Sequence, residues 1–313
     1  MLDPPESLQF AIRELIDGAR PRRLKEGLEG CGEIEAAVTD ERGIDSVSER
    51  VERPRRRLAR RARPGYRITV HRDLHRFFAD VAGLLSARSE IVSATGEVRA
   101  PADLTHAEAA AALQGAIDTY VRSGEWRPPQ ELWGADYRRM LRQQENPSEP
   151  MKALMQMGED MAVFVAAHEL GHILLGHCDG PAPSTTGEHW EDELEADRTA
   201  AALLPGYYRQ QVAWSPSFST AAKPVVFEMA VSKATIAVAV LFELLYLFSE
   251  HARQLGRTWT RSHPPGDLRY QSFRAFNLEQ LGRPETVFTT GMGLGSPDST
   301  RLLFRELAAG LVS

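Results

Sequence analysis

The side chains of this sequence best suited to catalysis lie in one short stretch, His168-Glu169-Leu170-Gly171-His172. Apolar residues flank it on both sides, which predicts a buried helix. On a helix, His168 and His172 share one face because they are four residues apart. Two imidazoles placed in this way can bind one metal ion, and Glu169 can reach a water molecule held by that ion. The pattern therefore predicts metal-assisted hydrolysis with Glu169 as the catalytic base.

A simpler interpretation is that two histidines and a solvated glutamate lie on a helix surface. The flanking residues argue against it, because Met161 to Ala167 and Ile173 to Leu175 are almost wholly apolar. Burying these three polar side chains without partners would cost several kcal/mol, roughly 2–7 for each neutral group. A metal ion with its ligands would satisfy them, so we favour a metal site.

A catalytic zinc ion usually takes three protein ligands and one water molecule, so a third ligand is needed. The chain from Cys178 to Glu188 is rich in Gly, Pro, Ser and Thr and predicts a turn. A second helix is then expected from His189 to Leu204, ending at Pro205. On that helix Glu193 and Asp197 lie on one face, which makes both candidates.

The other residues of this second helix have simpler expected roles. Its small side chains would let it approach the first helix closely; they are Ala196, Thr199, Ala200, Ala201 and Ala202. Its remaining acids, Glu191, Asp192 and Glu195, are expected to form a solvated acidic helix start, which the helix dipole favours.

The two motifs in this order, with Glu193-x-x-Ala196-Asp197 second, resemble the gluzincin metallopeptidases. This resemblance implies an α+β, mainly helical chain with a zincin-like core, made of an active-site helix, a small sheet and a glutamate helix. It also implies that His168, His172 and Glu193 bind Zn²⁺. Asp197 would then lie behind the site and hydrogen-bond His168, an arrangement that fixes the tautomer of a zinc-bound histidine.

A third motif, Ser262-His263-Pro264-Pro265 followed by Arg269, is similar to the His-Pro-Pro element of the CAAX prenyl protease and HtpX group. The resemblance implies that this segment folds back over the zinc site. His263 or Arg269 could then stabilise the oxyanion of a tetrahedral intermediate. Equally, Arg269 could pair with an acidic helix and hold the segment in place, and the sequence leaves both roles open.

Two further groups share parts of this pattern. ImmA/IrrE-type regulatory proteases resemble the chain from Glu193 to Asp197 and again at Leu203-Leu204-Pro205, and Lit-like phage-exclusion peptidases resemble it through Gly176-His177. The resemblances cover about Met157 to Arg269. Metzincins are excluded, because Cys178 stands where their third histidine is expected and His177 falls one residue short. Cys178 itself is expected to be a buried or helix-terminal thiol rather than a ligand.

Composition sets limits on the whole chain. It has 313 residues, of which 42% are hydrophobic, and a net charge of −6, which does not favour nucleic acid as the main partner. Two cysteines argue against a disulfide-stabilised secreted protein. The first residues lack the pattern of a signal peptide. The most apolar segment, Ala234 to Phe248, is shorter than a membrane span and contains Glu243, so we expect a core helix, a soluble cytoplasmic chain and no membrane insertion.

The whole chain is expected to divide into four parts. Residues 1–64 form an N-terminal helical and arginine-rich segment, and residues 65–150 form small strands and helices that precede the core. Residues 151–282 form the metallopeptidase core, and residues 283–313 form a loop and a final helix. Tyr66 to Val70 predicts a strand, and Glu90 to Val98 is the expected sheet edge for an extended substrate. The seven arginines between residues 53 and 63 are interpreted as a solvated linker, with a nucleic-acid patch as the alternative. His71 and His75 are expected to be ordinary packing or surface residues.

Together these features predict a soluble zinc-dependent endopeptidase that cleaves a specific intracellular protein, in a stress or phage-defence setting implied by the resemblance. A different class of function is a regulatory zinc-containing binding protein without turnover. A nucleic-acid-binding module is the weakest alternative, since no aromatic residues interleave with the arginines. The sequence identifies neither the substrate nor the oligomeric state.

Overall fold

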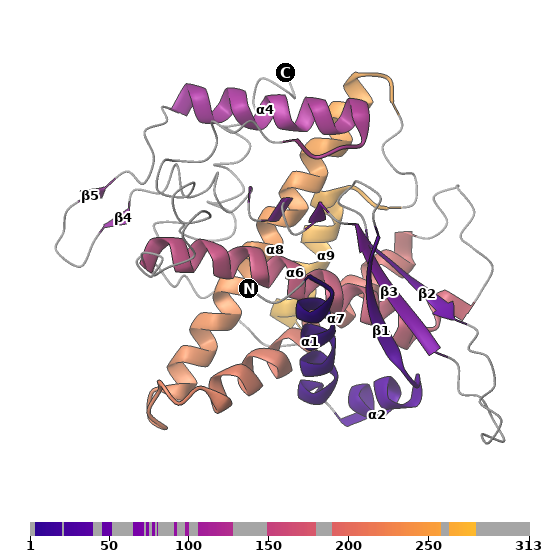
Figure 1. Cartoon of the computed structure of the whole chain (residues 1–313), viewed down its shortest axis with the longest axis vertical. Coiled ribbons are helices and arrows are strands. Elements are labelled where there is room, and N and C mark those ends of the chain that lie inside the picture. Colours follow the sequence, from indigo (N-terminus) through magenta and orange to yellow (C-terminus); the bar gives the residue numbers. More distant parts are fainter. Residues whose placement is uncertain are drawn as a thin grey trace.

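The computed structural model describes residues 4–20, 22–39, 46–51, 65–71, 73–74, 77–78, 80, 91–92, 98–99, 106–127, 149–179, 190–257 and 263–279. The described part is α+β and mainly helical, as predicted (Figure 1). Its helices are α1 (Pro4–Gly18), α2 (Arg22–Gly30), α4 (His106–Ser123), α6 (Glu149–Leu175), α7 (Trp190–Trp214), α8 (Lys223–Gln254) and α9 (Gly266–Glu279), with a short 3₁₀ turn η2 (His177–Asp179). Its strands are β1 (Ile34–Thr39), β2 (Ser46–Val51), β3 (Gly65–His71), β4 (Ile91–Val92) and β5 (Val98–Arg99).

The larger sheet has the strand order β1-β3-β2 and lies beside α6 (Figure 1). Strand β1 runs parallel to β3, with Ile34 opposite Tyr66, whereas β2 runs antiparallel to it, with Ser46 opposite Val70. The predicted strand at Tyr66 to Val70 is therefore confirmed. Its alternating side chains Tyr66, Ile68 and Val70 are buried, which fixes the face of the sheet that meets the core.

Strands β1 and β2 correct the prediction that residues 1–64 are helical apart from an arginine-rich linker. Their residues are mixed in polarity, and β2 has only half-buried or exposed side chains. A strand at the edge of a small sheet can be this polar, so it carries little hydrophobic alternation for a sequence pattern to detect. The predicted boundary between residues 64 and 65 also falls within this sheet, because β3 begins at Gly65 and pairs with both earlier strands.

The edge strand that contacts α6 is β2 and not the predicted segment Glu90 to Val98. From that segment the structure describes β4 and the first residue of β5, and these two short strands form a separate sheet by pairing with each other. Because β4 and β5 are two residues long, they offer little edge for an extended peptide. Any peptide that extends the larger sheet next to the histidine motif would therefore pair with β2.

Helices α6 and α7 pack against each other at very short range, as the small residues of α7 predict. A Cβ atom added at Gly171 would lie 2.9 Å from the carbonyl oxygen of Ala196. Three rings then join α6 to the C-terminal helices: Phe164, Phe242 and Phe273 meet edge to face, with centroids 5.4 to 5.9 Å apart. This packing fixes the positions of α6, α7, α8 and α9 relative to one another.

Helix α7 does not stop at Pro205, contrary to the prediction, but continues to Trp214. A proline inside a helix costs about 3 kcal/mol, because it removes one hydrogen bond and crowds the preceding turn. Tertiary contacts offset this cost. The next residue, Gly206, lies so close to α1 that an added Cβ would clash with the carbonyl oxygen of Gly18. Two residues further on, the buried Tyr208 donates a 2.6 Å hydrogen bond to Asp160 on α6.

Helix α8 is the one helix in the described part of the chain that is long and apolar enough to cross a membrane. Its central residues are nevertheless buried within the protein, with Val238, Phe242 and Phe248 fully enclosed. It packs against α4, α6, α7 and α9. Burial of this kind is typical of the core helix of a soluble protein.

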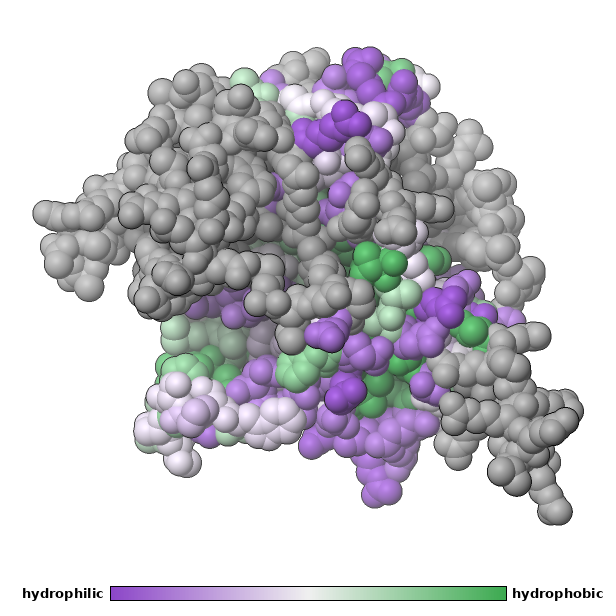
Figure 2. All heavy atoms as spheres, viewed as in Figure 1, coloured by the Kyte–Doolittle hydropathy of each residue, from purple (hydrophilic) through white to green (hydrophobic). Residues whose placement is uncertain are grey.

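At the surface, hydrophilic side chains gather over α2, at the lower centre of Figure 2. Here Arg22 pairs with Glu26, and Leu28 alone among the residues of α2 is buried. Several predicted segments lie outside the described residues, namely the arginine run, His75, and the loop and helix expected from 283 onward.

Candidate metal centre

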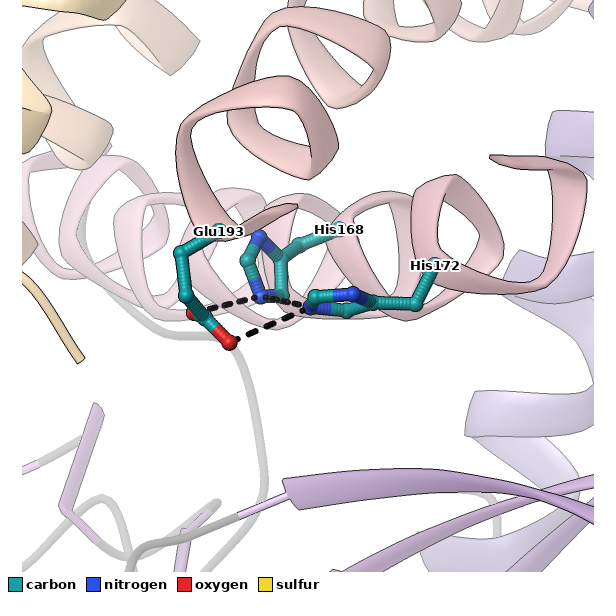
Figure 3. A group of neighbouring side chains, drawn as sticks. All are labelled: His168, His172 and Glu193. Atoms are coloured by element: carbon teal, nitrogen blue, oxygen red, sulfur yellow. Dashed lines mark hydrogen bonds and ion pairs between the residues drawn. The ribbon is translucent and has the colours of Figure 1, made fainter. Parts of the chain in front are cut away.

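Two helices bring the three predicted metal ligands together. Helix α6 presents His168 and His172 one turn apart, and Glu193 reaches them from the first turn of α7 (Figure 3). The two Nε2 atoms are 3.0 Å apart, and each is 3.4 Å from an oxygen of Glu193. His168 and Glu193 are buried and His172 is mostly buried, so the cluster lies below the protein surface.

The spacing of these atoms fits a metal ion between them. Two nitrogen ligands at about 2.1 Å from a tetrahedral zinc ion are about 3.4 Å from each other, and a carboxylate oxygen falls at a similar separation. Glu193 Oε2 is buried and has no hydrogen-bond partner. A buried carboxylate oxygen without a hydrogen bond is costly, and a cation would satisfy it. His168, His172 and Glu193 thus form a buried cluster compatible with metal binding.

The charges of this cluster also favour a cation. Burial lowers the pKa of His168, but the carboxylates of Asp197 and Glu193 outweigh burial and raise that pKa to about 9. Burial raises the pKa of Glu193. The imidazoles of His168, His172 and His263 lower that pKa by more than burial raises it, so the net shift is strongly downward. Without a metal, a proton on His168 therefore balances part of the negative charge, and a bound cation would replace it.

Asp197 contacts His168 on the ring nitrogen that faces away from Glu193. Its side chain is fully buried, and Oδ1 lies 2.9 Å from Nδ1 of His168, which leaves Nε2 facing Glu193. Arg269 on α9 donates from Nε to Oδ2 of Asp197 at 2.8 Å and from a terminal nitrogen to Oδ1 at 2.7 Å. Of the two roles that the sequence left open for Arg269, pairing with an acidic helix is the one that these contacts fit.

His263 lies next to Glu193 at the same cluster. Its Nδ1 is 2.8 Å from Oε2 of Glu193, although the angles do not make a hydrogen bond. Its side chain is 39% exposed, whereas that of Arg269 is 8% exposed, so His263 is the more accessible of the two. Pro265 begins the first turn of α9, since its carbonyl accepts from the backbone of Leu268 and Arg269. The segment from His263 to Arg269 therefore folds back against the cluster; Ser262 lies outside the described residues.

Glu169, the candidate base, is buried beside the two histidines on α6. Ser46, the first residue of the edge strand β2, donates a 2.7 Å hydrogen bond from Oγ to Oε1 of Glu169. This serine was missed in the sequence, where no signal links it to a glutamate 123 positions later. The pairing of β2 with β3 is what brings it to α6.

The sequence assigned His177 no role beyond its part in the Gly176-His177 resemblance and its misplacement for a metzincin ligand, yet its Nδ1 is 2.9 Å from Nδ1 of His172. Its Nε2 is 3.7 Å from Asp192 and 3.6 Å from Glu195. These two acids keep 41% and 45% of their side-chain surface exposed, which agrees with the expected solvated acidic helix start, and both also face His177. Burial and the neighbouring His172 lower the pKa of His177, although both acids oppose that shift.

The remaining residues of interest lie outside the ligand cluster. Cys178 Sγ is 3.3 Å from Ser48 Oγ, and burial raises the pKa of its thiol, in agreement with a packed thiol rather than a ligand. Glu191 forms an ion pair with Arg198 at the start of α7. His71 ends β3 and belongs to neither group of candidate metal ligands among the described residues.

Comparison with protein-family models, with curated proteins and with solved structures gave no match to this chain.

Proposed function

We propose that this chain is a zinc-dependent endopeptidase whose core of α6, α7 and the larger sheet is zincin-like. The observation that carries the proposal is the convergence of His168, His172 and Glu193, with the carboxylate of Glu169 held beside them. Two histidines and one carboxylate form the ligand set of many catalytic zinc sites, which keep a fourth position open. A purely structural zinc site more often has four protein ligands and does not require a neighbouring base.

In the proposed reaction, His168, His172 and Glu193 would hold the zinc ion. A bound zinc ion would lower the pKa of a coordinated water molecule and polarise the carbonyl of the scissile peptide. Glu169 would take up the water proton at Oε2, because Oε1 accepts the hydrogen bond of Ser46. It would then deliver that proton to the leaving amine.

The other groups at the site would have distinct roles. Asp197 would keep the Nε2 of His168 directed at the ion, and Arg269 would keep Asp197 charged and in place. His263 is partly exposed and adjacent to Glu193, so it is the residue that we assign to the oxyanion. Arg269 is only 8% exposed and directs two donors at Asp197, so we assign it to holding Asp197.

A protein or peptide substrate would bind in an extended conformation along β2. In the described sheet this strand pairs with β3 on one side only, and it starts at the residue that contacts Glu169. Val47, the next residue, is 55% exposed and offers an apolar contact for a substrate side chain. Addition of a peptide to such an edge uses backbone hydrogen bonds for affinity and side-chain contacts for selectivity. We extend the proposal to a soluble cytoplasmic protease with one specific protein target, in a stress or phage-defence setting.

The test compares the wild type with Glu169→Gln, by metal analysis of the purified proteins and by identification of new protein termini after expression of each. We expect both proteins to carry one zinc ion per chain and only the wild type to generate new termini. Glu159→Gln is a matched control on the same helix, because Glu159 is exposed and remote from the cluster.

Proteolysis by Glu169→Gln equal to that of the wild type would overturn the mechanism. A zinc-loaded wild type that cleaves none of the proteins expressed with it would instead favour the regulatory binding protein without turnover. A wild type that binds no zinc would overturn the metal centre itself.

A further inference from the structure

The second nitrogen of each candidate zinc histidine has a partner. Nδ1 of His168 lies against Asp197, and Nδ1 of His172 lies 2.9 Å from Nδ1 of His177. The first arrangement is the familiar one in which a carboxylate supports a histidine ligand. The second is less usual, because an imidazole takes the place of the carboxylate, and it decides where the protons of both rings must be.

The proton positions follow from the number of donors and acceptors that each imidazole ring has. A neutral imidazole carries one N–H and one acceptor nitrogen. If Nε2 of His172 binds the metal, the proton of His172 is on Nδ1, so Nδ1 of His177 must accept the hydrogen bond. The proton of His177 is then on Nε2, which faces Asp192 at 3.7 Å and Glu195 at 3.6 Å. Both carboxylates favour this tautomer, because each attracts an N–H and repels a lone pair.

We propose that His177 is a positioning residue, which accepts the hydrogen bond from Nδ1 of His172 and thereby fixes the ring and tautomer of the second metal ligand. Asp192 and Glu195 hold His177 in the tautomer that can accept. The inference deepens the proposed metal centre and depends on His172 as a ligand, but it does not depend on whether the protein cleaves peptides.

A second metal ion is the competing explanation for His177, Asp192 and Glu195, whose ligand atoms lie within 4.8 Å of one another. Proton counting argues against it when the first site is filled. An ion on Nε2 of His177 would move that proton to Nδ1, where it would point at the Nδ1–H of His172 across 2.9 Å. The two N–H groups would repel each other. Asp192 and Glu195 are also 41% and 45% exposed, so water already solvates their charges.

The experiment replaces His177 and measures zinc affinity by competition with a chromophoric chelator, together with the visible spectrum of the Co²⁺-substituted protein. His177→Phe keeps a ring but removes the acceptor, and we expect a zinc affinity about 10- to 100-fold lower and an altered Co²⁺ spectrum. His177→Asn places an amide oxygen near the position of Nδ1, and we expect it to restore most of both readouts.

Matched controls separate positioning from general damage. His251→Phe removes another buried histidine with a carboxylate partner, Asp118, far from the cluster in sequence and on a different pair of helices. We expect this control to alter thermal stability without lowering zinc affinity. Asp192→Asn combined with Glu195→Gln should reduce zinc affinity less than His177→Phe does, at an unchanged stoichiometry of one ion per chain.

Two results would overturn the proposal. One is a His177→Phe protein with wild-type zinc affinity and Co²⁺ spectrum. The other is a wild type that binds two ions, of which one is lost in the Asp192→Asn, Glu195→Gln protein. A wild type that binds one zinc ion but shows no proteolysis contradicts the proposed endopeptidase and leaves these affinity measurements decisive for His177.

Discussion

Ser46 donates a hydrogen bond to Glu169 and thereby joins the edge strand of the sheet to the histidine helix. The donor oxygen is 2.7 Å from Oε1 of the glutamate, and Glu169 is buried. A hydroxyl donor bonded to a carboxylate fixes the orientation of that carboxylate. The same strand that would bind a substrate therefore also holds the group that would act on it.

Replacement of Ser46 by Ala is expected to lower kcat about 10- to 150-fold while zinc affinity is unchanged, since a hydrogen bond to a charged group contributes about 1.5–3 kcal/mol. Steady-state kinetics on a cleaved substrate, with metal analysis in parallel, measures this. Ser48→Ala is the matched control, because Ser48 lies on the same strand and contacts Cys178 rather than Glu169. An equal loss of kcat in both variants would contradict a specific role for Ser46.

Replacement of Arg269 by Met is expected to destabilise the protein by about 3–5 kcal/mol, because the buried Asp197 would lose the guanidinium that donates to both of its oxygens. Arg269→Lys should retain part of the lost stability, since lysine keeps the charge but lacks the paired donors of a guanidinium. Denaturant unfolding followed by tryptophan fluorescence measures the free energy of unfolding of both variants. Arg253→Met, which removes an exposed guanidinium that pairs with Glu250, should leave the unfolding midpoint close to that of the wild type. Unfolding of Arg269→Met at the wild-type midpoint would refute the expectation.

Zinc affinity is expected to rise with pH up to about 9. The pKa of His168 in the metal-free protein is raised from 6.5 to about 9, and zinc binds only the unprotonated ring. From about pH 7 to 9, apparent affinity should therefore rise about tenfold per pH unit through this group alone. Chelator competition at several pH values measures the slope. A slope of zero over this range would show that His168 is already unprotonated.

The same group sets the pH dependence of the metal-free fold. Because its pKa is higher in the folded than in the unfolded state, His168 stabilises the metal-free protein fully below pH 6.5, and this contribution is lost as pH rises through about 9. Removal of the metal should therefore destabilise the protein more at pH 9 than at pH 6. Thermal unfolding with and without a chelator at both pH values tests this difference.

Replacement of Asp160 by Asn is expected to stabilise the protein at pH 8. Burial is the main cause that raises the pKa of Asp160 from 3.8 to about 7. The protonated carboxyl therefore contributes stability below pH 3.8, which is lost as pH rises through 7. Asn stays neutral, and its oxygen can accept from both Tyr208 and Gln156, as Oδ1 of Asp160 does. Urea unfolding of both proteins at pH 5 and 8 should show a gain for the variant that is larger at pH 8; an equal difference at both pH values would contradict it.

The sequence by itself determined which side chains of the candidate site share a helix face, because helical spacing is local. His168 and His172 are four positions apart, as are Glu193 and Asp197, and this spacing places each pair on one helix face whatever the rest of the chain does. The apolar residues that flank His168 and His172 likewise predicted α6, and the apolar segment from Ala234 to Phe248 predicted α8, since a helix that is apolar on most faces must be buried.

Only the tertiary structure decided what depends on contacts between distant segments. The continuation of α7 through Pro205 is stabilised by Gly18 and Asp160, which no local pattern contains. The edge strand β2 is too polar to be recognised alone, and it exists because β3 provides its hydrogen bonds. The pairing of Arg269 with Asp197, of Ser46 with Glu169 and of His177 with His172 was settled in the same way. Residue types and local spacing fix which groups can react, whereas packing between elements fixes which of them meet.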